Sequence, residues 1–287
     1  MKLLFLGTGA GEGYPGRWCE CPNCAYARAH RGRNLRANSS AMLDDALMLD
    51  MNGATFDNAA RFGAHPSRAH TLLITHPHED HLYPQELIWR RGRTDATRLN
   101  LDGLQALGSA PRFTPLPPMT IVGNGYAEDL LLRAYPDSAA MEYEFRRVEP
   151  GDALQSHGYR ITALRGNHVR PGYTTNYIVE KDGKSLLYAL DTGGYDEDMR
   201  DILRRQRLDL VVMEGTGGLS SCGDGHMCLE KNEFWRKWML ENGVIAPDTP
   251  FVLTHLSPHW TPPHDRFADI AAQRGMTVAW DGMEIEI

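Results

Sequence analysis

The segment at residues 71–82, TLLITHPHEDHL, restricts the fold of this chain more than any other part of its sequence. Its apolar run at 72–74 predicts a short buried strand, and a dense set of metal-binding side chains follows at once. These side chains are His76, His78, Asp80 and His81. Neutral imidazoles and an ionised carboxylate at this spacing suit a divalent cation, whereas charged imidazoles would repel one another. Because residues two apart on an extended segment point the same way, His76 and His78 can hold one ion, while Asp80 and His81 face a second position.

This pattern, His76-x-His78-x-Asp80-His81, resembles the HxHxDH signature of the metallo-β-lactamase superfamily. The resemblance implies a single domain over residues 1–287 of the α/β (α+β) class, a four-layer αββα metallo-β-lactamase sandwich with its metals at one edge. It also implies three later ligands, each placed after a strand: a histidine, a bridging aspartate and a last histidine.

Residues of these types follow three later strand-like runs in that order, at His168, Asp191 and His255. Strand ends are rigid, so they can hold metal ligands within tenths of an ångström. The resemblance then implies one metal bound by His76, His78 and His168, and another bound by Asp80, His81 and His255. Asp191 would bridge the two. Zinc, manganese or iron suits these ligands, and a hydroxide shared by two such cations would be the nucleophile.

Two residues are candidates for catalytic roles beyond the metals. Asp80 belongs to the signature itself. His226 lies in a late glycine-rich loop, SCGDGHMC, and matches the family position thought to protonate the leaving alkoxide. A mobile surface histidine is the alternative interpretation of His226.

The cluster Cys19, Cys21 and Cys24 predicts a structural zinc site, because tetrahedral zinc takes thiolates at such spacing and needs one more ligand. Buried or redox-active thiols are the alternative. The resemblance implies that the fourth ligand follows the last active-site histidine. This role is carried to His259, although the run HLSPH is one residue longer than the family's HxxH. His226, with two further thiols beside it, is the rival.

Three other segments support this interpretation. The early glycine-rich stretch at 7–13 lacks the spacing of a dinucleotide-binding loop, so its glycines are expected to let the backbone pass close to the metals. Asp50 ends a predicted strand and is expected either to support the HxHxDH loop or to face solvent. Residues 90–118 read as a lid-like insertion, where Arg90, Arg91 and Arg93 bring positive charge over the site or form a solvated surface.

Composition narrows the partners. The net charge of −7 argues against a broad nucleic-acid-binding face, and no apolar run approaches the about 18 residues of a membrane span. The opening MKLLFLGTGAG is too short before its glycines for a signal peptide, so we expect a cytoplasmic enzyme without membrane contacts. A homodimer is compatible with these features.

The stretches GEGYPGRWCECPNC, LDTGG and VAWDGMEI resemble the cyclic-phosphate phosphodiesterases associated with carbon–phosphorus lyase. This resemblance, essentially end to end, implies hydrolysis of a small cyclic phosphate such as 5-phosphoribosyl 1,2-cyclic phosphate. The pyrroloquinoline-quinone biosynthesis B proteins share the cysteine cluster and are the main alternative. A transfer-RNA 3′ endonuclease shares the FLGTG opening, but the chain shows no basic, Gly/Pro-rich arm to grip transfer RNA.

Overall fold

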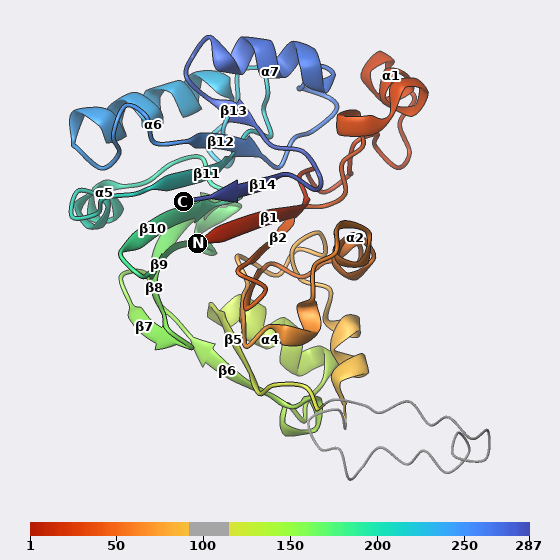
Figure 1. Ribbon diagram of the computed structural model, residues 1–287, viewed down its shortest axis with the longest axis vertical. Helices are drawn as coiled ribbons and strands as arrows, with labels where there is room; N and C mark the ends of the chain where they lie inside the picture. The colour runs from red at the N-terminus through yellow and green to blue at the C-terminus, as the bar shows by residue number, and fades with distance from the viewer. Residues whose placement is uncertain (92–114) are drawn as a thin grey trace.

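The computed structural model describes residues 1–91 and 115–287, which form two mixed seven-stranded sheets (Figure 1). In spatial order, the first sheet contains β14 (Glu284–Glu286), β1 (Lys2–Gly7), β2 (Ser40–Leu43), β3 (Leu47–Leu49), β4 (Thr71–Leu73), β5 (Met119–Gly123) and β6 (Tyr143–Arg147). The second contains β13 (Thr277–Val278), β12 (Phe251–Thr254), β11 (Leu210–Glu214), β10 (Lys184–Ala189), β9 (Arg170–Lys181), β8 (Tyr159–His168) and β7 (Ala153–Ser156).

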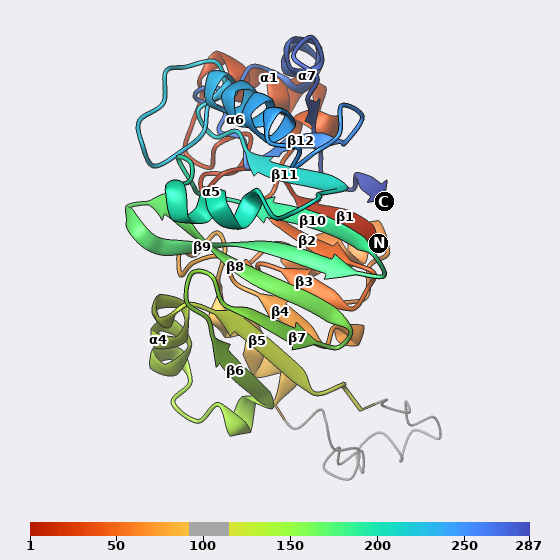
Figure 2. The ribbon, with the colours of Figure 1, turned by 90° about the vertical axis from the view of Figure 1, so that its left-hand side faces the viewer.

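Helices cover the outer faces of both sheets (Figures 1 and 2). The α-helices are α1 (Pro22–His30), α2 (Thr55–Phe62), α4 (Gly125–Ala134), α5 (Glu197–Leu203), α6 (Leu229–Glu241) and α7 (His264–Ala272). Short 3-10 helices occur at η1 (Gly32–Asn34), η2 (Pro66–Arg68), η3 (Pro84–Arg90) and η5 (Ala139–Met141). Helices α2 and α4 pack on the first sheet, and α5, α6 and α7 pack on the second.

Three apolar clusters produce this layering. Alternate strand residues point to opposite faces, so each sheet contributes one face to a shared core and the other to its helices. Phe5 and Leu47 of the first sheet meet Tyr159 and Tyr177 of the second in the central cluster. The outer clusters lie between each sheet and its helices. The predicted four-layer αββα sandwich is therefore confirmed.

The predicted strand that ends at Asp50 is found as β3, which pairs with β2, and the turn between them has Asp44 and Asp45 at positive φ angles of 53° and 54°. One boundary differs: β8 continues through His168, so this histidine ends the strand, past a bulge at Gly166 and Asn167, instead of following it. The cross-strand pairing with β9 extends the strand beyond its apolar run.

Most of the predicted lid at 90–118 lies outside the described residues, as does Arg93. Arg91 is exposed, whereas Arg90 is buried and donates a hydrogen bond from Nη2 to the Pro117 carbonyl oxygen at 2.8 Å. Arg90 therefore ties η3 to the residues before β5. Among the residues that the structure describes, no helix is long and apolar enough to cross a membrane.

The direction of the strands gathers their C-terminal ends at one edge. Strands β3, β4 and β5 are parallel neighbours in the first sheet, and β10, β11 and β12 are parallel neighbours in the second. Strand β8 runs antiparallel to β9, which runs antiparallel to β10, so β8 and β10 share a direction. Residues that follow these strands are thereby brought together from both sheets.

Candidate metal centre

The side chains of this edge come from strand ends with unusual backbone conformations. Asp50, Asp191 and His255 follow β3, β10 and β12 within two residues, and their φ angles are 59°, 48° and 57°. Residues other than glycine seldom adopt positive φ, and such strain persists where the surrounding structure enforces it. The backbone therefore turns sharply at each of these three strand ends, and the turn directs the side chain of Asp50, Asp191 or His255 into the space between the sheets.

The first group of potential ligands contains His76, His78 and His168. Their ring nitrogens lie within 4.8 Å of one another, and Nε2 of His76 is 2.9 Å from Nδ1 of His78. His76 and His78 come from the loop after β4, whereas His168 comes from the second sheet. The structure thus brings together residues some ninety positions apart, in the set expected from the sequence.

The second group contains Asp80, His81 and His255. Nε2 of His81 is 3.1 Å from Oδ2 of Asp80 and 3.1 Å from Nε2 of His255. Nε2 of His255 is 3.4 Å from the same Asp80 oxygen. Three ligand atoms from two sheets therefore face one point.

Asp191 stands between the two groups and turns one oxygen toward each. Its Oδ1 is 3.7 Å from Nε2 of His168, in the first group. Its Oδ2 is 3.0 Å from Nε2 of His81 and 3.2 Å from Nε2 of His255, in the second group. This is the geometry that a bridging carboxylate requires.

Polar groups outside the centre hold the imidazoles in place. Oδ2 of the fully buried Asp50 lies 2.8 Å from Nδ1 of His81, and Oγ1 of Thr216 lies 2.8 Å from Nδ1 of His255. Nδ1 of His168 lies 3.2 Å from the Gly225 carbonyl oxygen. A proton on each Nδ1 leaves Nε2 free as a ligand, the usual arrangement around bound metals. Asp50 was expected either to support the HxHxDH loop or to face solvent, and its buried contact with His81 agrees with the first of these.

The pKa shifts of the centre favour ionised carboxylates, whereas those of its histidines go in both directions. Burial alone would raise the pKa values of Asp80 and Asp191, but the surrounding histidines, His81 among them, hold both well below the ordinary value. Burial lowers the pKa values of His76 and His168. For His81, burial has the same sign, yet the carboxylates around it raise its pKa well above the usual value. Ionised carboxylates and neutral imidazoles are what a cation binds, and the shift at His81 shows how strongly its position attracts positive charge.

Two atoms test whether divalent cations fit. Oδ2 of Asp191 and Nε2 of His168 are buried without a hydrogen-bond partner, although buried polar atoms are nearly always paired. Each belongs to a different ligand set, so a cation in each set would satisfy one of them. Imidazole nitrogens with carboxylate oxygens suit zinc, manganese or iron. The residues therefore fit a pair of divalent cations.

His226 lies beside the centre, as expected for an active-site residue. Its ring centroid is 4.6 Å from that of His168, and its Nδ1 is 3.8 Å from Oδ1 of Asp191. Burial lowers the pKa of His226, but Glu214 and then Asp191 outweigh burial and raise it to about 9. Because His226 lies beside His168 and Asp191, it is not grouped with the cysteines, and it does not serve as their fourth ligand in this structure.

Sequence reasoning missed Glu214, the last residue of β11. It is fully buried, and its Oε1 lies 2.8 Å from Nδ1 of His226 and accepts a hydrogen bond from the backbone N–H of Thr192 at 2.9 Å. A carboxylate there fixes the ring of His226 and favours its charged form. The signal was present, because Glu214 ends an apolar strand as Asp50 does.

The early glycines also approach the centre. A Cβ on Gly11 would lie 3.4 Å from Oδ2 of Asp80. At Gly7 the same addition would come within 1.9 Å of the Asn38 carbonyl oxygen, which no side chain could tolerate. Gly11 therefore lies against the metal centre, as expected from the sequence, whereas Gly7 packs against the backbone of Asn38.

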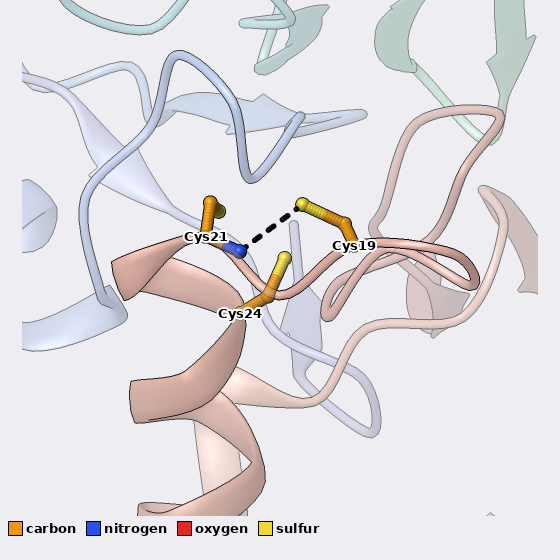
Figure 3. A group of neighbouring side chains, drawn as sticks. All are labelled: Cys19, Cys21 and Cys24. Carbon is orange, nitrogen blue, oxygen red and sulfur yellow. Dashed lines mark hydrogen bonds between the residues drawn. The ribbon is translucent and has the colours of Figure 1, made fainter.

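The three early cysteines converge at the start of α1 (Figure 3). The sulfur atoms of Cys19, Cys21 and Cys24 lie within 4.8 Å of one another. Sγ of Cys24 accepts a hydrogen bond from the Gly16 N–H at 3.2 Å, and Sγ of Cys19 accepts one from the Cys21 N–H at 3.4 Å. Three thiols from a six-residue stretch thus share one small space, as a zinc site requires.

The structure does not bring His259 into this thiol group. Its Nδ1 faces Oε1 of Glu12 at 3.5 Å, and its side chain is about half exposed. Its segment nevertheless borders the cluster, because Nδ2 of Asn23 donates hydrogen bonds to the carbonyl oxygens of Pro258 and Thr261 at 2.9 and 3.2 Å. The assignment of His259 as the fourth zinc ligand stays a prediction.

No family model matches the chain. A coenzyme PQQ synthesis protein B from Methylobacterium radiotolerans is 29% identical over 246 residues, 75% of this chain and 73% of the relative. A ribonuclease Z from Listeria innocua is 29% identical over 198 residues, 66% of this chain and 52% of the relative.

Solved structures resemble the whole chain. A diphosphatase from the PhnP family superposes with a TM-score of 0.70 at 21% identity, over 100% of this chain and 96% of that one. Zinc-bound PqqB from Methylobacterium extorquens gives a TM-score of 0.66 at 17% identity, over 100% of both chains. A metallo-β-lactamase fold protein from Bacillus subtilis, YhfI, gives a TM-score of 0.64 at 16% identity, over 100% of this chain and 98% of that one. The chain therefore has the metallo-β-lactamase fold.

Proposed function

We propose that this protein is a metal-dependent hydrolase, a phosphodiesterase with two divalent cations that cleaves a small cyclic phosphate. The observation that carries the proposal is Asp191, whose two oxygens each face a different ligand set at 3.0–3.7 Å. Such a pair of cations, when bound, supplies an activated water and neutralises the charge of phosphoryl oxygens. The diphosphatase with a similar fold supports a phosphate substrate by analogy.

The protein's own residues then have distinct tasks. The two ligand sets and Asp191 would hold the pair of cations, while Asp50 and Thr216 keep His81 and His255 oriented. His226 stands at the edge with its Nδ1 on Glu214, so its Nε2 can deliver a proton to the departing alkoxide. Asp80 acts through its place in the second ligand set.

The position of Arg170 is a second argument for an anionic substrate. It begins β9, two residues after His168, and its guanidinium carbon lies 4.7 Å from the ring centroid of Tyr126 and 5.1 Å from that of Tyr173. The Tyr173 ring is in turn 5.3 Å from the ring of His78. Nε of Arg170 donates a hydrogen bond to Oη of Tyr126 at 3.2 Å, and no carboxylate of the described residues is paired with this guanidinium. An exposed cation beside the first ligand set suits a second phosphate, as in 5-phosphoribosyl 1,2-cyclic phosphate.

Metal analysis with a phosphodiesterase assay tests the proposal. We expect about three metals per chain, a pair at the active centre and one zinc at the cysteines, and hydrolysis of bis(p-nitrophenyl) phosphate that stops on chelation. Asp191→Ala should abolish turnover because it removes the bridge. Asp209→Ala, which removes a carboxylate paired with Lys184 elsewhere, is the matched control and should keep activity. Full activity of Asp191→Ala with its metals bound would refute the mechanism.

A role in quinone cofactor synthesis is the second candidate, and the whole-chain likeness to PqqB favours it. It predicts a different outcome of the same measurement, namely zinc at the cysteines, iron at the pair and no phosphodiester hydrolysis. Natively purified protein therefore distinguishes the two functions.

A further inference from the structure

Two further cysteines, Cys222 and Cys228, stand at the two ends of the loop that carries His226. Both are free thiols outside the zinc cluster, and Cys228 is buried while Cys222 is partly exposed. Their side chains meet over Gly217: a Cβ built there would lie 2.9 Å from Cβ of Cys222 and 3.0 Å from Cβ of Cys228. The two Cβ atoms are therefore no farther apart than these distances combined. A disulfide needs about 3.5–4.5 Å between them, so a small movement suffices.

The two thiols differ in reactivity. Cys228 is the N-cap residue of α6, where the backbone N–H groups and the helix dipole favour a thiolate. Burial raises its pKa, but the Cys222 thiol and the N–H groups of the first helical turn outweigh burial, so the net shift is downward. For Cys222, burial and then the neighbouring Cys228 raise the pKa to about 12. Cys228 is thus the more easily deprotonated of the two neighbouring thiols.

The loop between these cysteines also holds part of the metal centre. The Asp224 carbonyl oxygen accepts a hydrogen bond from Nδ2 of Asn167 at 3.1 Å, and the Gly225 carbonyl oxygen lies 3.2 Å from Nδ1 of His168. His226 follows directly. A movement of this loop therefore displaces both a predicted metal ligand and the predicted proton donor.

We propose that Cys222 and Cys228 form a reversible disulfide in response to a peroxide, and that this bond switches the metal centre off. The thiolate of Cys228 attacks one oxygen of hydrogen peroxide, the O–O bond breaks, and hydroxide leaves, which gives a sulfenic acid. The sulfur of Cys222 then attacks that of Cys228; its proton and the hydroxyl group leave as water. Two thiols are oxidised and one peroxide is reduced to two waters. A dithiol reverses the bond by exchange.

The loss of activity follows from the loop's contacts. Closing the bond draws Cys222 toward the start of α6 and shifts residues 223–227, including the carbonyl group on His168. Displacement by about 1 Å in an active site can cost about a hundredfold in rate. We therefore expect the oxidised protein to lose at least about tenfold in activity and to bind its first-site metal less tightly.

The test treats metal-loaded protein with limited peroxide and then with dithiothreitol. Non-reducing peptide mapping should show a Cys222–Cys228 cross-link, with the zinc-cluster cysteines unmodified. Bis(p-nitrophenyl) phosphate hydrolysis and metal content should fall together and recover on reduction. Cys222→Ser should form no cross-link and keep its activity under the same treatment, and Cys228→Ser should likewise form no cross-link.

The absence of the cross-link in oxidised wild-type protein would overturn the inference. So would a complete cross-link that changes neither metal content nor activity. The activity readout rests on the proposed function, but the cross-link and the metal content do not. If untreated protein hydrolyses no phosphodiester, the proposed function fails, while these two measurements still decide the switch.

Discussion

Asp50→Asn should prevent His81 from acting as a metal ligand while its imidazole side chain stays in place. One carboxylate oxygen of Asp50, Oδ1, accepts from the backbone N–H of Thr75 at 2.8 Å, and the Thr75 hydroxyl lies 3.0 Å from both carboxylate oxygens. The other, Oδ2, lies 2.8 Å from Nδ1 of His81. In the asparagine variant, the amide oxygen must face the backbone N–H of Thr75, which can only donate, so the NH₂ group faces His81. Nδ1 must then accept, and the proton moves to Nε2, the atom that faces Asp80 and Asp191.

The change should weaken metal binding at the second ligand set. Loss of a group that orients a metal-bound histidine typically costs about 10- to 100-fold in affinity, or about 1.4–2.7 kcal/mol. Competition with a chromophoric chelator measures this affinity, and zinc at the cysteine cluster should be unaffected.

Asp44→Asn is the matched control for Asp50→Asn. Asp44 also has positive φ and precedes β3, whereas Asp50 follows it. Asp44 accepts hydrogen bonds from Tyr159 Oη and the Lys2 N–H, neither of which belongs to the metal centre. It should change stability and leave metal affinity intact. Equal affinities in wild type and Asp50→Asn would refute the reasoning about the tautomer of His81.

Three further variants test other parts of the structure. Cys21→Ala should lower the free energy of unfolding by about 2 kcal/mol or more, because it removes a predicted zinc ligand; a folded, zinc-replete variant without activity would instead contradict a structural role. Arg170→Gln should raise KM for 5-phosphoribosyl 1,2-cyclic phosphate about five- to tenfold and leave bis(p-nitrophenyl) phosphate nearly unaffected, with Arg165→Gln, whose guanidinium pairs with Asp196, as control; equal effects on both substrates would count against it. Burial and then Arg36 lower the pKa of His264 to about 4, so the unfolded chain binds a proton that the folded one refuses between pH 6.5 and 4. As the pH falls through that window, the free energy of unfolding of the wild type should therefore decrease by more than that of His264→Asn. Urea unfolding at pH 7 and 5 measures both decreases, and equal decreases in the two proteins would show that His264 does not contribute. Asp281, with its pKa raised to about 6 mainly by burial, acts with the opposite sign in both proteins.

The sequence by itself determined which segments end in metal-binding side chains. Apolar runs mark the strands, and the residues that follow them, from His76 to His255, can be read directly from the chain. The HxHxDH pattern resembles the signature of one superfamily, and this resemblance predicted the αββα sandwich and the order of the later ligands. Even the approach of the glycine-rich stretch to the metals followed from the freedom of its backbone.

Only the tertiary structure decided how distant residues meet. It placed His226 on Glu214 instead of among the cysteines, turned His259 toward Glu12, and buried Asp50 against His81. It also brought Cys222 and Cys228 together over Gly217. Spacing along the chain cannot give these contacts, because they depend on the packing of two sheets and on positive φ angles at strand ends. Those backbone angles are set by the surrounding packing, which aims each side chain after the strand itself has ended.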